Sequence, residues 1–89
     1  MVLVKKIILD VLKPHQPNAL DFSRAIAEVG DDYYILLSVI EMDENTETVQ
    51  IEVSAHSIDF DAIQNIINHM GGSIHSIDEV EVQSEIETG

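Results

Sequence analysis

The sequence predicts one α+β domain in which two strand-helix-strand halves share a single antiparallel sheet. Three observations support this prediction. Several short segments alternate apolar and polar residues, as strands with one buried face do. Two other segments repeat apolar residues at helical spacing and end at a glycine. The chain has 89 residues, which is long enough for one hydrophobic core and too short for two.

The first half begins with an apolar strand and continues into a helix. Residues 3–12 are expected to form the strand, which a segment containing two prolines ends because proline cannot donate to a sheet. Asn18 or Asp21 is the expected N-cap of the helix, and Gly30 its end. The helical stripe consists of Phe22, Ala25, Ile26 and Val29.

A hairpin and a second helix follow. Residues 33–42 form an apolar run rich in β-branched and aromatic residues, a polar turn follows, and residues 49–55 alternate in the pattern of a half-buried strand. Asp59 is the expected N-cap of the second helix and Gly71 its end. Its stripe consists of Ile63, Ile66, Ile67 and Met70.

The last strand, expected over about residues 74–82, completes two halves of the same design. Two such halves joined by a central hairpin, with right-handed crossovers, give a four-stranded antiparallel sheet with both helices on one face. This arrangement is the ferredoxin-like β-α-β-β-α-β sandwich. Residues 1–84 are expected to form the domain, and residues 85–89 an acidic C-terminal tail.

Composition excludes several functions. The chain has no cysteine, so disulfides, zinc ribbons and iron–sulfur clusters are excluded. Asp and Glu number 17 against 4 Lys and Arg, and the resulting net charge of −13 repels nucleic acid. The apolar run 2–12 is too short and too charged to span a bilayer or to serve as a signal peptide. A cytoplasmic protein without a membrane partner is therefore expected.

The sheet face that the helices leave open is predicted to carry apolar side chains. Tyr34, Leu36, Ile40 and Met42 share one face of the second strand, and Ile8 lies on the corresponding face of the first. A monomer would expose this surface to water, so we expect a homo-oligomer.

The last strand also suggests a cation site. Its alternation breaks between Ile77 and Val80, which predicts a bulge or an inward-facing Asp78. If His15 pairs near the start of this strand, Asp10 of the first strand falls opposite Asp78 and Glu79. Facing carboxylates repel unless a cation lies between them or one is protonated, so these three side chains are candidate ligands for a calcium or magnesium ion. The alternative is that Asp10 pairs with Lys6 or Lys13 at the surface.

Four further polar side chains are expected at one end of the sandwich, where the first strand ends, the hairpin turns and the last strand begins: His15, Asp43, Glu47 and His75. No nucleophile–base pair can be identified, so an enzyme is not predicted. The sequence favours a non-enzymatic binding module for divalent cations or a small ligand. The alternative is a structural homo-oligomeric assembly without a ligand.

Four segments resemble those of an archaeal family known as "domain of unknown function 211". They are Leu9-Asp10-Val11-Leu12-Lys13-Pro14-His15, the hairpin segments Glu41-Met42-Asp43 and Thr46-Glu47, and Ile74-His75-Ser76-Ile77-Asp78-Glu79-Val80. The resemblance implies a ferredoxin-like fold, an archaeal cytoplasm, oligomeric assembly and no established activity.

Overall fold

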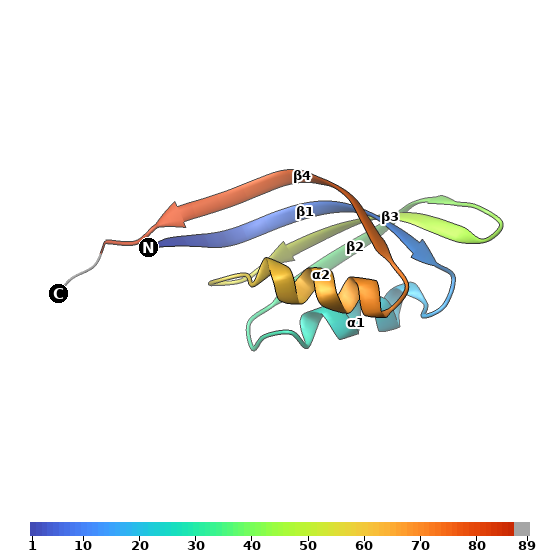
Figure 1. Cartoon of the computed structure of the whole chain (residues 1–89), viewed down its shortest axis with the longest axis horizontal. Helices are drawn as coiled ribbons and strands as arrows, with labels where there is room; N and C mark the ends of the chain where they lie inside the picture. The colour runs from blue at the N-terminus through green and yellow to red at the C-terminus, as the bar shows by residue number, and fades with distance from the viewer. Residues whose placement is uncertain (87–89) are drawn as a thin grey trace.

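A computed structural model describes residues 1–86 and has the expected ferredoxin-like fold. Its elements are β1 (Val2–Pro14), α1 (Ala19–Ala27), β2 (Tyr34–Met42), β3 (Thr46–Ser54), α2 (Phe60–His69) and β4 (Ser73–Ser84). The strands form one antiparallel sheet in the order β2-β3-β1-β4, and both helices cover the same face of it (Figure 1). Of the tail expected over residues 85–89, residues 87–89 lie outside the described part of the chain.

The helices begin where their caps predict. The Asn18 side chain accepts a hydrogen bond from the Asp21 backbone N–H at 2.8 Å, which selects Asn18 over Asp21 as the N-cap of α1. Asp59 accepts in the same way from the Ala62 N–H at 3.1 Å and begins α2. Neither α1 nor α2, the helices of residues 1–86, is long and apolar enough to cross a membrane.

The core lies between the helices and the helix-covered face of the sheet. Alternation along β1 turns Ile7, Leu9 and Val11 toward the helices, and β3 does the same with every second residue. Because both central strands contribute apolar side chains at each level, the core is built almost entirely from aliphatic residues around Phe22. Its fully buried apolar members are Leu9, Val11, Phe22, Ile26, Val49, Ile51, Val53, Ile63 and Ile67.

Four irregularities interrupt the ladders. Asp78 and His75 are extra residues in β4 relative to β1, Lys5 is an extra residue in β1, and Ile40 is an extra residue in β2 relative to β3. The bulge predicted between Ile77 and Val80 is therefore confirmed at Asp78.

The observed register of β4 differs from the predicted one, because Ile74 pairs with Val11 and not with His15. Asp10 lies opposite Ser76, and Ile8 lies opposite Glu79, so the expectation that Asp10 faces Asp78 and Glu79 is wrong. Ile74 and Ile77 share one face with two polar residues between them, so the second bulge, at His75, interrupts the alternation in the same way as the bulge at Asp78. These breaks do not determine which residue of β1 lies opposite.

The open face of the sheet also differs from the expectation. The residues of β3 on this face are polar, and β3 lies between β2 and β1. The apolar side chains of β2 and β1 are consequently separated: Leu36 of β2 and Ile8 of β1 both face Glu52 of β3. The predicted continuous apolar stripe is interrupted, and exposed apolar side chains are concentrated on the edge strands instead.

The molecule is elongated, with extents of 55 × 22 × 17 Å. Figure 1 shows why: the beginning of β1 and the end of β4 run past the helices as a two-stranded ribbon near the N-terminus. Val80 and Val82 of β4 lie on this part of the sheet and are more than half exposed, because neither α1 nor α2 covers them.

Candidate functional site

A buried ion pair closes the end of the core nearest the hairpin. Lys13 of β1 is fully buried, and Glu47 of β3 exposes only 6% of its surface. The Lys13 Nζ donates to Glu47 Oε1 at 3.2 Å and to the Pro14 carbonyl at 2.8 Å. The same ammonium lies 5.6 Å from the centroid of the Phe22 ring, within cation–π range. The aliphatic part of Lys13 therefore belongs to the core while its charge is fully engaged.

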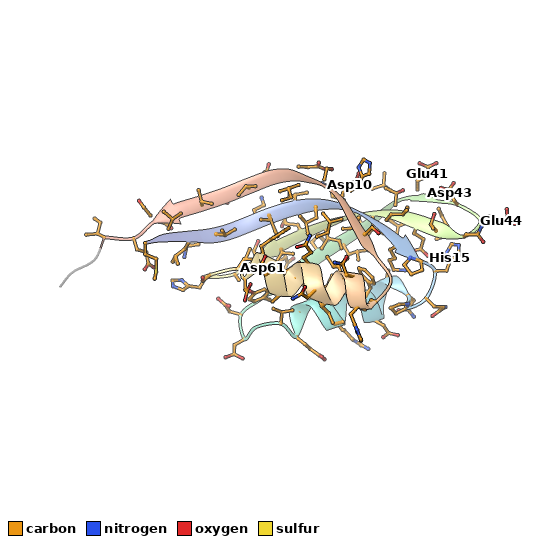
Figure 2. The ribbon with its side chains drawn as sticks, in the orientation of Figure 1. Asp10, His15, Glu41, Asp43, Glu44 and Asp61 are labelled. Carbon is orange, nitrogen blue, oxygen red and sulfur yellow. The ribbon has the colours of Figure 1, made fainter. Side chains whose placement is uncertain are left out.

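His15 joins this ion pair to the tip of the β2–β3 hairpin. Its Nδ1 lies 2.9 Å from Glu47 Oε2, and its Nε2 lies 3.0 Å from each of the Asp43 and Glu44 carbonyl oxygens. Figure 2 shows His15 at the end of β1, beside Asp43 and Glu44. Carboxylate and carbonyl oxygens only accept hydrogen bonds, so both ring nitrogens must carry protons for all of these contacts to form. The geometry therefore favours the imidazolium form.

The electrostatics agree with this geometry. The hydrogen bond to Glu47, followed by the Glu44 carbonyl, raises the pKa of His15 above its ordinary value. The hydrogen bond from His15 lowers the pKa of Glu47 against the opposing effect of desolvation, and Lys13 lowers it further. Of the side chains expected together at this end, His15, Asp43 and Glu47 meet, although Asp43 takes part through its backbone.

His75, the fourth of these residues, lies elsewhere. His75 is a bulged residue on the open face of the sheet, and its Nδ1 lies 3.5 Å from Asp10 Oδ2. Asp10 and His75, together with Leu12 and Thr48, line a shallow pocket of about 250 Å³. Figure 2 shows Asp10 on the side of the sheet away from the helices. Three neighbouring strands thus contribute one carboxylate, one imidazole, one hydroxyl and one apolar side chain to this open-face pocket.

The three predicted cation ligands have separate partners. Asp78 accepts a hydrogen bond from Ser76 Oγ at 2.7 Å, and Glu79 Oε2 lies 3.1 Å from Lys6 Nζ. That contact raises the pKa of Lys6, with Glu52 contributing after Glu79. Within residues 1–86, no group of three or more His, Cys, Asp or Glu side chains is arranged to hold a metal ion.

The alternative expectation, that Asp10 pairs with Lys6 or Lys13, is also wrong. Lys6 pairs with Glu52 and Glu79, and Lys13 pairs with Glu47, whereas Asp10 lies beside His75. Asp10 thus lies beside an imidazole whose side chain is 80% exposed.

Sequence reasoning missed the buried role of Lys13, although the signal was present. Lys13 continues the alternation of Leu9 and Val11, and Glu47 continues that of Val49 and Ile51, so both strands turn one charged residue inward at the same end. Two opposite charges at adjacent inward positions of neighbouring strands indicate a buried ion pair. Nothing comparable in the sequence identifies Thr48 as a residue of the open-face pocket, because its contribution to that pocket depends on where His75 lies.

Two comparisons connect the chain to known proteins. The model of the DUF211 family, described as "Uncharacterized ArCR", matches residues 5–88. An "Uncharacterized protein MJ0319" of Methanocaldococcus jannaschii is 40% identical over 77 residues, which cover 86% of this chain and 79% of that protein. The family match extends over most of β1, the hairpin and β4, which carry the buried ion pair and the open-face pocket.

Proposed function

The chain belongs to the DUF211 family, and we propose that it functions there as a non-enzymatic protein that assembles with copies of itself. The observation that carries this proposal is the position of its exposed apolar side chains. Most of them lie on β2 and β4, the two edge strands, and β3 has none. They are Tyr34, Leu36, Val39, Ile40 and Met42 on β2, and Ile77, Val80 and Val82 on β4.

Edge strands with this composition are unusual in soluble monomers. Each edge presents unpaired backbone donors and acceptors, and soluble proteins commonly protect such edges with charges, prolines or a covering element. The stretch of β2 from Tyr34 to Ile40 contains neither a charge nor a proline. Association with another copy would satisfy the backbone groups and remove the apolar side chains from water at the same time.

The net charge of −13 opposes this association, because each copy repels the next. Salt screens the repulsion between exposed charges beyond about 10 Å at 0.1 M. Assembly should therefore strengthen as sodium chloride is added, whereas an assembly held by exposed ion pairs would weaken.

Light scattering coupled to size exclusion at micromolar concentration tests the proposal. We expect a mass that is a multiple of the 9.9 kDa chain, and a larger oligomeric fraction at higher salt. A mass of 9.9 kDa at every salt concentration would overturn the proposal.

A second candidate function, binding of a divalent cation, is favoured by the Asp10–His75 contact in the open-face pocket. Their separation of 3.5 Å is long for a hydrogen bond. It is close to the distance of about 3.3 Å between two ligand atoms of a tetrahedral site with bonds of about 2.0–2.1 Å. Asp10 and His75 would supply two ligands to the cation. The other positions would be filled by Thr48, by water or by a group from another copy. Calcium or magnesium at Asp10 with Asp78 or Glu79, as the sequence predicts, would require these side chains to leave their present partners.

Thermal unfolding with calcium, magnesium or zinc, against sodium chloride at matched ionic strength, distinguishes these possibilities. At one hundred times its dissociation constant a cation stabilises the fold by about 2.7 kcal/mol. A domain of this size gains about 4–8 °C per kcal/mol, so a rise on the order of 10 °C is expected. His75→Gln should abolish an effect of zinc, whereas Asp78→Asn should abolish an effect of calcium or magnesium. If no divalent cation exceeds the sodium control, the cation function is refuted.

A further inference from the structure

The helix-covered face of the sheet carries three rows of apolar side chains that run across all four strands. In each row, one residue of β1 has a partner in β3 and another in β4, and the β3 residue has its own partner in β2. From β2 to β4, the rows are Ile35, Val53, Ile7 and Val80; Leu37, Ile51, Leu9 and Ile77; and Val39, Val49, Val11 and Ile74.

These apolar rows continue to both edges of the sheet, where Ile35, Leu37 and Ile74 pack against the core and the other edge members are exposed. The central members of the rows are buried, whereas Val39 at the β2 edge exposes 43% of its surface, and Ile77 and Val80 at the β4 edge are about half exposed. Soluble proteins commonly protect the edges of a sheet with charged side chains, prolines or a covering element. Here each row stops at an edge with an apolar residue, so that a further strand could extend it on either side.

The directions of the strands determine how the edge strands β2 and β4 of two copies can pair. β1 is antiparallel to both β3 and β4, and β2 is antiparallel to β3. β2 and β4 therefore run in opposite directions. A second copy placed beside the first in the same orientation brings its β2 antiparallel to β4, and the sheet continues without a reversal.

We propose that β2 of one copy lies antiparallel beside β4 of the next, so that the apolar rows continue from copy to copy. With the rows continued straight across, Val80 lies beside Ile35 of the next copy and Ile77 beside its Leu37. The next copy also brings its α1, which packs against β2, toward these exposed residues of β4. This inference rests on the proposed self-assembly and specifies the surfaces that perform it.

Charge favours this pairing over the two symmetric alternatives. β4 contains three carboxylates, Asp78, Glu79 and Glu81, and no Lys or Arg, so two copies joined through β4 would bring six carboxylates together. Glu41 is the one charged residue of β2. A contact between two β2 strands would avoid that repulsion but would leave the apolar residues of β4 in water.

The open face is compatible with the same register. Continued across the contact, its rows place Glu81 beside Tyr34 of the next copy and Glu79 beside Leu36. The remaining two rows place Ser76 beside Ser38 and Ser73 beside Glu41. No carboxylate meets another in these rows. A β2–β4 contact is heterologous, so it leaves a free edge at each end and joins copies into a ring or a filament.

Two variants that each block one edge test this inference. Val39→Asp places a carboxylate in the β2 edge, and Val80→Asp places one in the β4 edge. Both positions are substantially exposed in one copy, so the fold should tolerate the changes, which circular dichroism can verify. Leu12→Asp is the matched control, because Leu12 exposes the same 43% as Val39 but lies on the open face of the central strand β1.

A heterologous contact predicts complementation. Each edge variant alone should have the mass of one 9.9 kDa chain, and an equimolar mixture should have twice that mass, because the intact β4 of Val39→Asp can join the intact β2 of Val80→Asp. Leu12→Asp should keep the parent's mass. The gain of mass in the mixture requires both variants to be folded.

Each other outcome has a definite meaning. If Val80→Asp still dimerises while Val39→Asp does not, the contact joins two β2 strands, and the reverse result would indicate two β4 strands. If Leu12→Asp dissociates while the edge variants do not, the open face is the interface. These outcomes overturn the β2–β4 pairing and leave self-assembly intact, whereas a monomeric parent overturns both proposals.

Discussion

The buried pair of Lys13 and Glu47 makes a quantitative prediction about stability. Removing one partner of a buried ion pair costs about 3–5 kcal/mol, because the other charge remains without compensation. In Lys13→Met, Glu47 keeps its contact with His15, so we expect a loss near the lower limit, about 3 kcal/mol. In Glu47→Leu, Lys13 keeps only the Pro14 carbonyl and the Phe22 ring, so we expect a larger loss, about 4–5 kcal/mol.

The double variant Lys13→Met with Glu47→Leu should be more stable than Glu47→Leu alone. Both charges are then replaced by apolar groups of similar length, which is often close to neutral in a buried site. His15 loses one acceptor in this variant and keeps the Asp43 and Glu44 carbonyls. The double variant should therefore fall short of the parent by a small fraction of the sum of the two single losses.

Urea unfolding and thermal unfolding measure these differences. A loss of 3 kcal/mol corresponds to a decrease in melting temperature of about 12 °C or more in a domain of this size. Lys6→Met is the control, because Lys6 also lies on β1 and also pairs with glutamates, but its side chain is 30% exposed. The reasoning is refuted if Lys13→Met is no less stable than Lys6→Met, or if the double variant loses as much as the two single variants combined.

Two further predictions concern His15 and the cap of α1. Because its contacts raise the pKa of His15, its contribution is complete below about pH 6.5 and disappears as pH rises through the higher value of the folded state. The loss in His15→Gln should thus be largest below pH 6.5 and shrink in alkali, while an NMR titration giving His15 a pKa at or below about 6.5 would contradict the prediction. Asn18→Ala should cost about 1 kcal/mol by removing the acceptor for the Asp21 N–H, and Asn18→Asp should cost much less, so equal melting temperatures of these two variants would argue against the cap.

The fold was predictable because its determinants are local. Period-two alternation identified the strands and helical spacing identified the helices. Asp59 identified the start of α2, while Asn18 and Asp21 both remained candidates for the start of α1 until the structure selected Asn18. The right-handed crossover rule then leaves few ways to join two strand-helix-strand halves. Each of these signals lies within about ten residues of sequence, so none depended on knowing the tertiary contacts.

The candidate sites were less predictable because they depend on register. The sequence does not show that Ile74 pairs with Val11 and not with His15, so the contacts of Asp10 were misjudged: Asp10 faces Ser76, and the side chain that reaches it is the imidazole of the bulged His75. Alternation reports which face a residue occupies and does not report which residue lies opposite. The open face was misjudged for a related reason: two apolar strands predict a continuous patch only if they are neighbours, and here β3 separates them.

The proposed self-assembly and the proposed cation binding involve different faces of the sheet, which leads to a last prediction. Val80 belongs to an apolar row on the helix-covered side of an edge strand, whereas Asp10 lies on the open face of the central strand β1, where β3 and β4 flank it. A charge change at Asp10 therefore leaves the β2–β4 contact intact, and a block at Val80 leaves the open-face pocket intact. Asp10→Asn should keep the oligomeric mass, and Val80→Asp should keep any stabilisation that a divalent cation gives to the parent. If Val80→Asp loses that stabilisation while remaining folded, the cation is held jointly by two copies, and the remaining ligands must come from the strand of the neighbouring copy that lies beside β4.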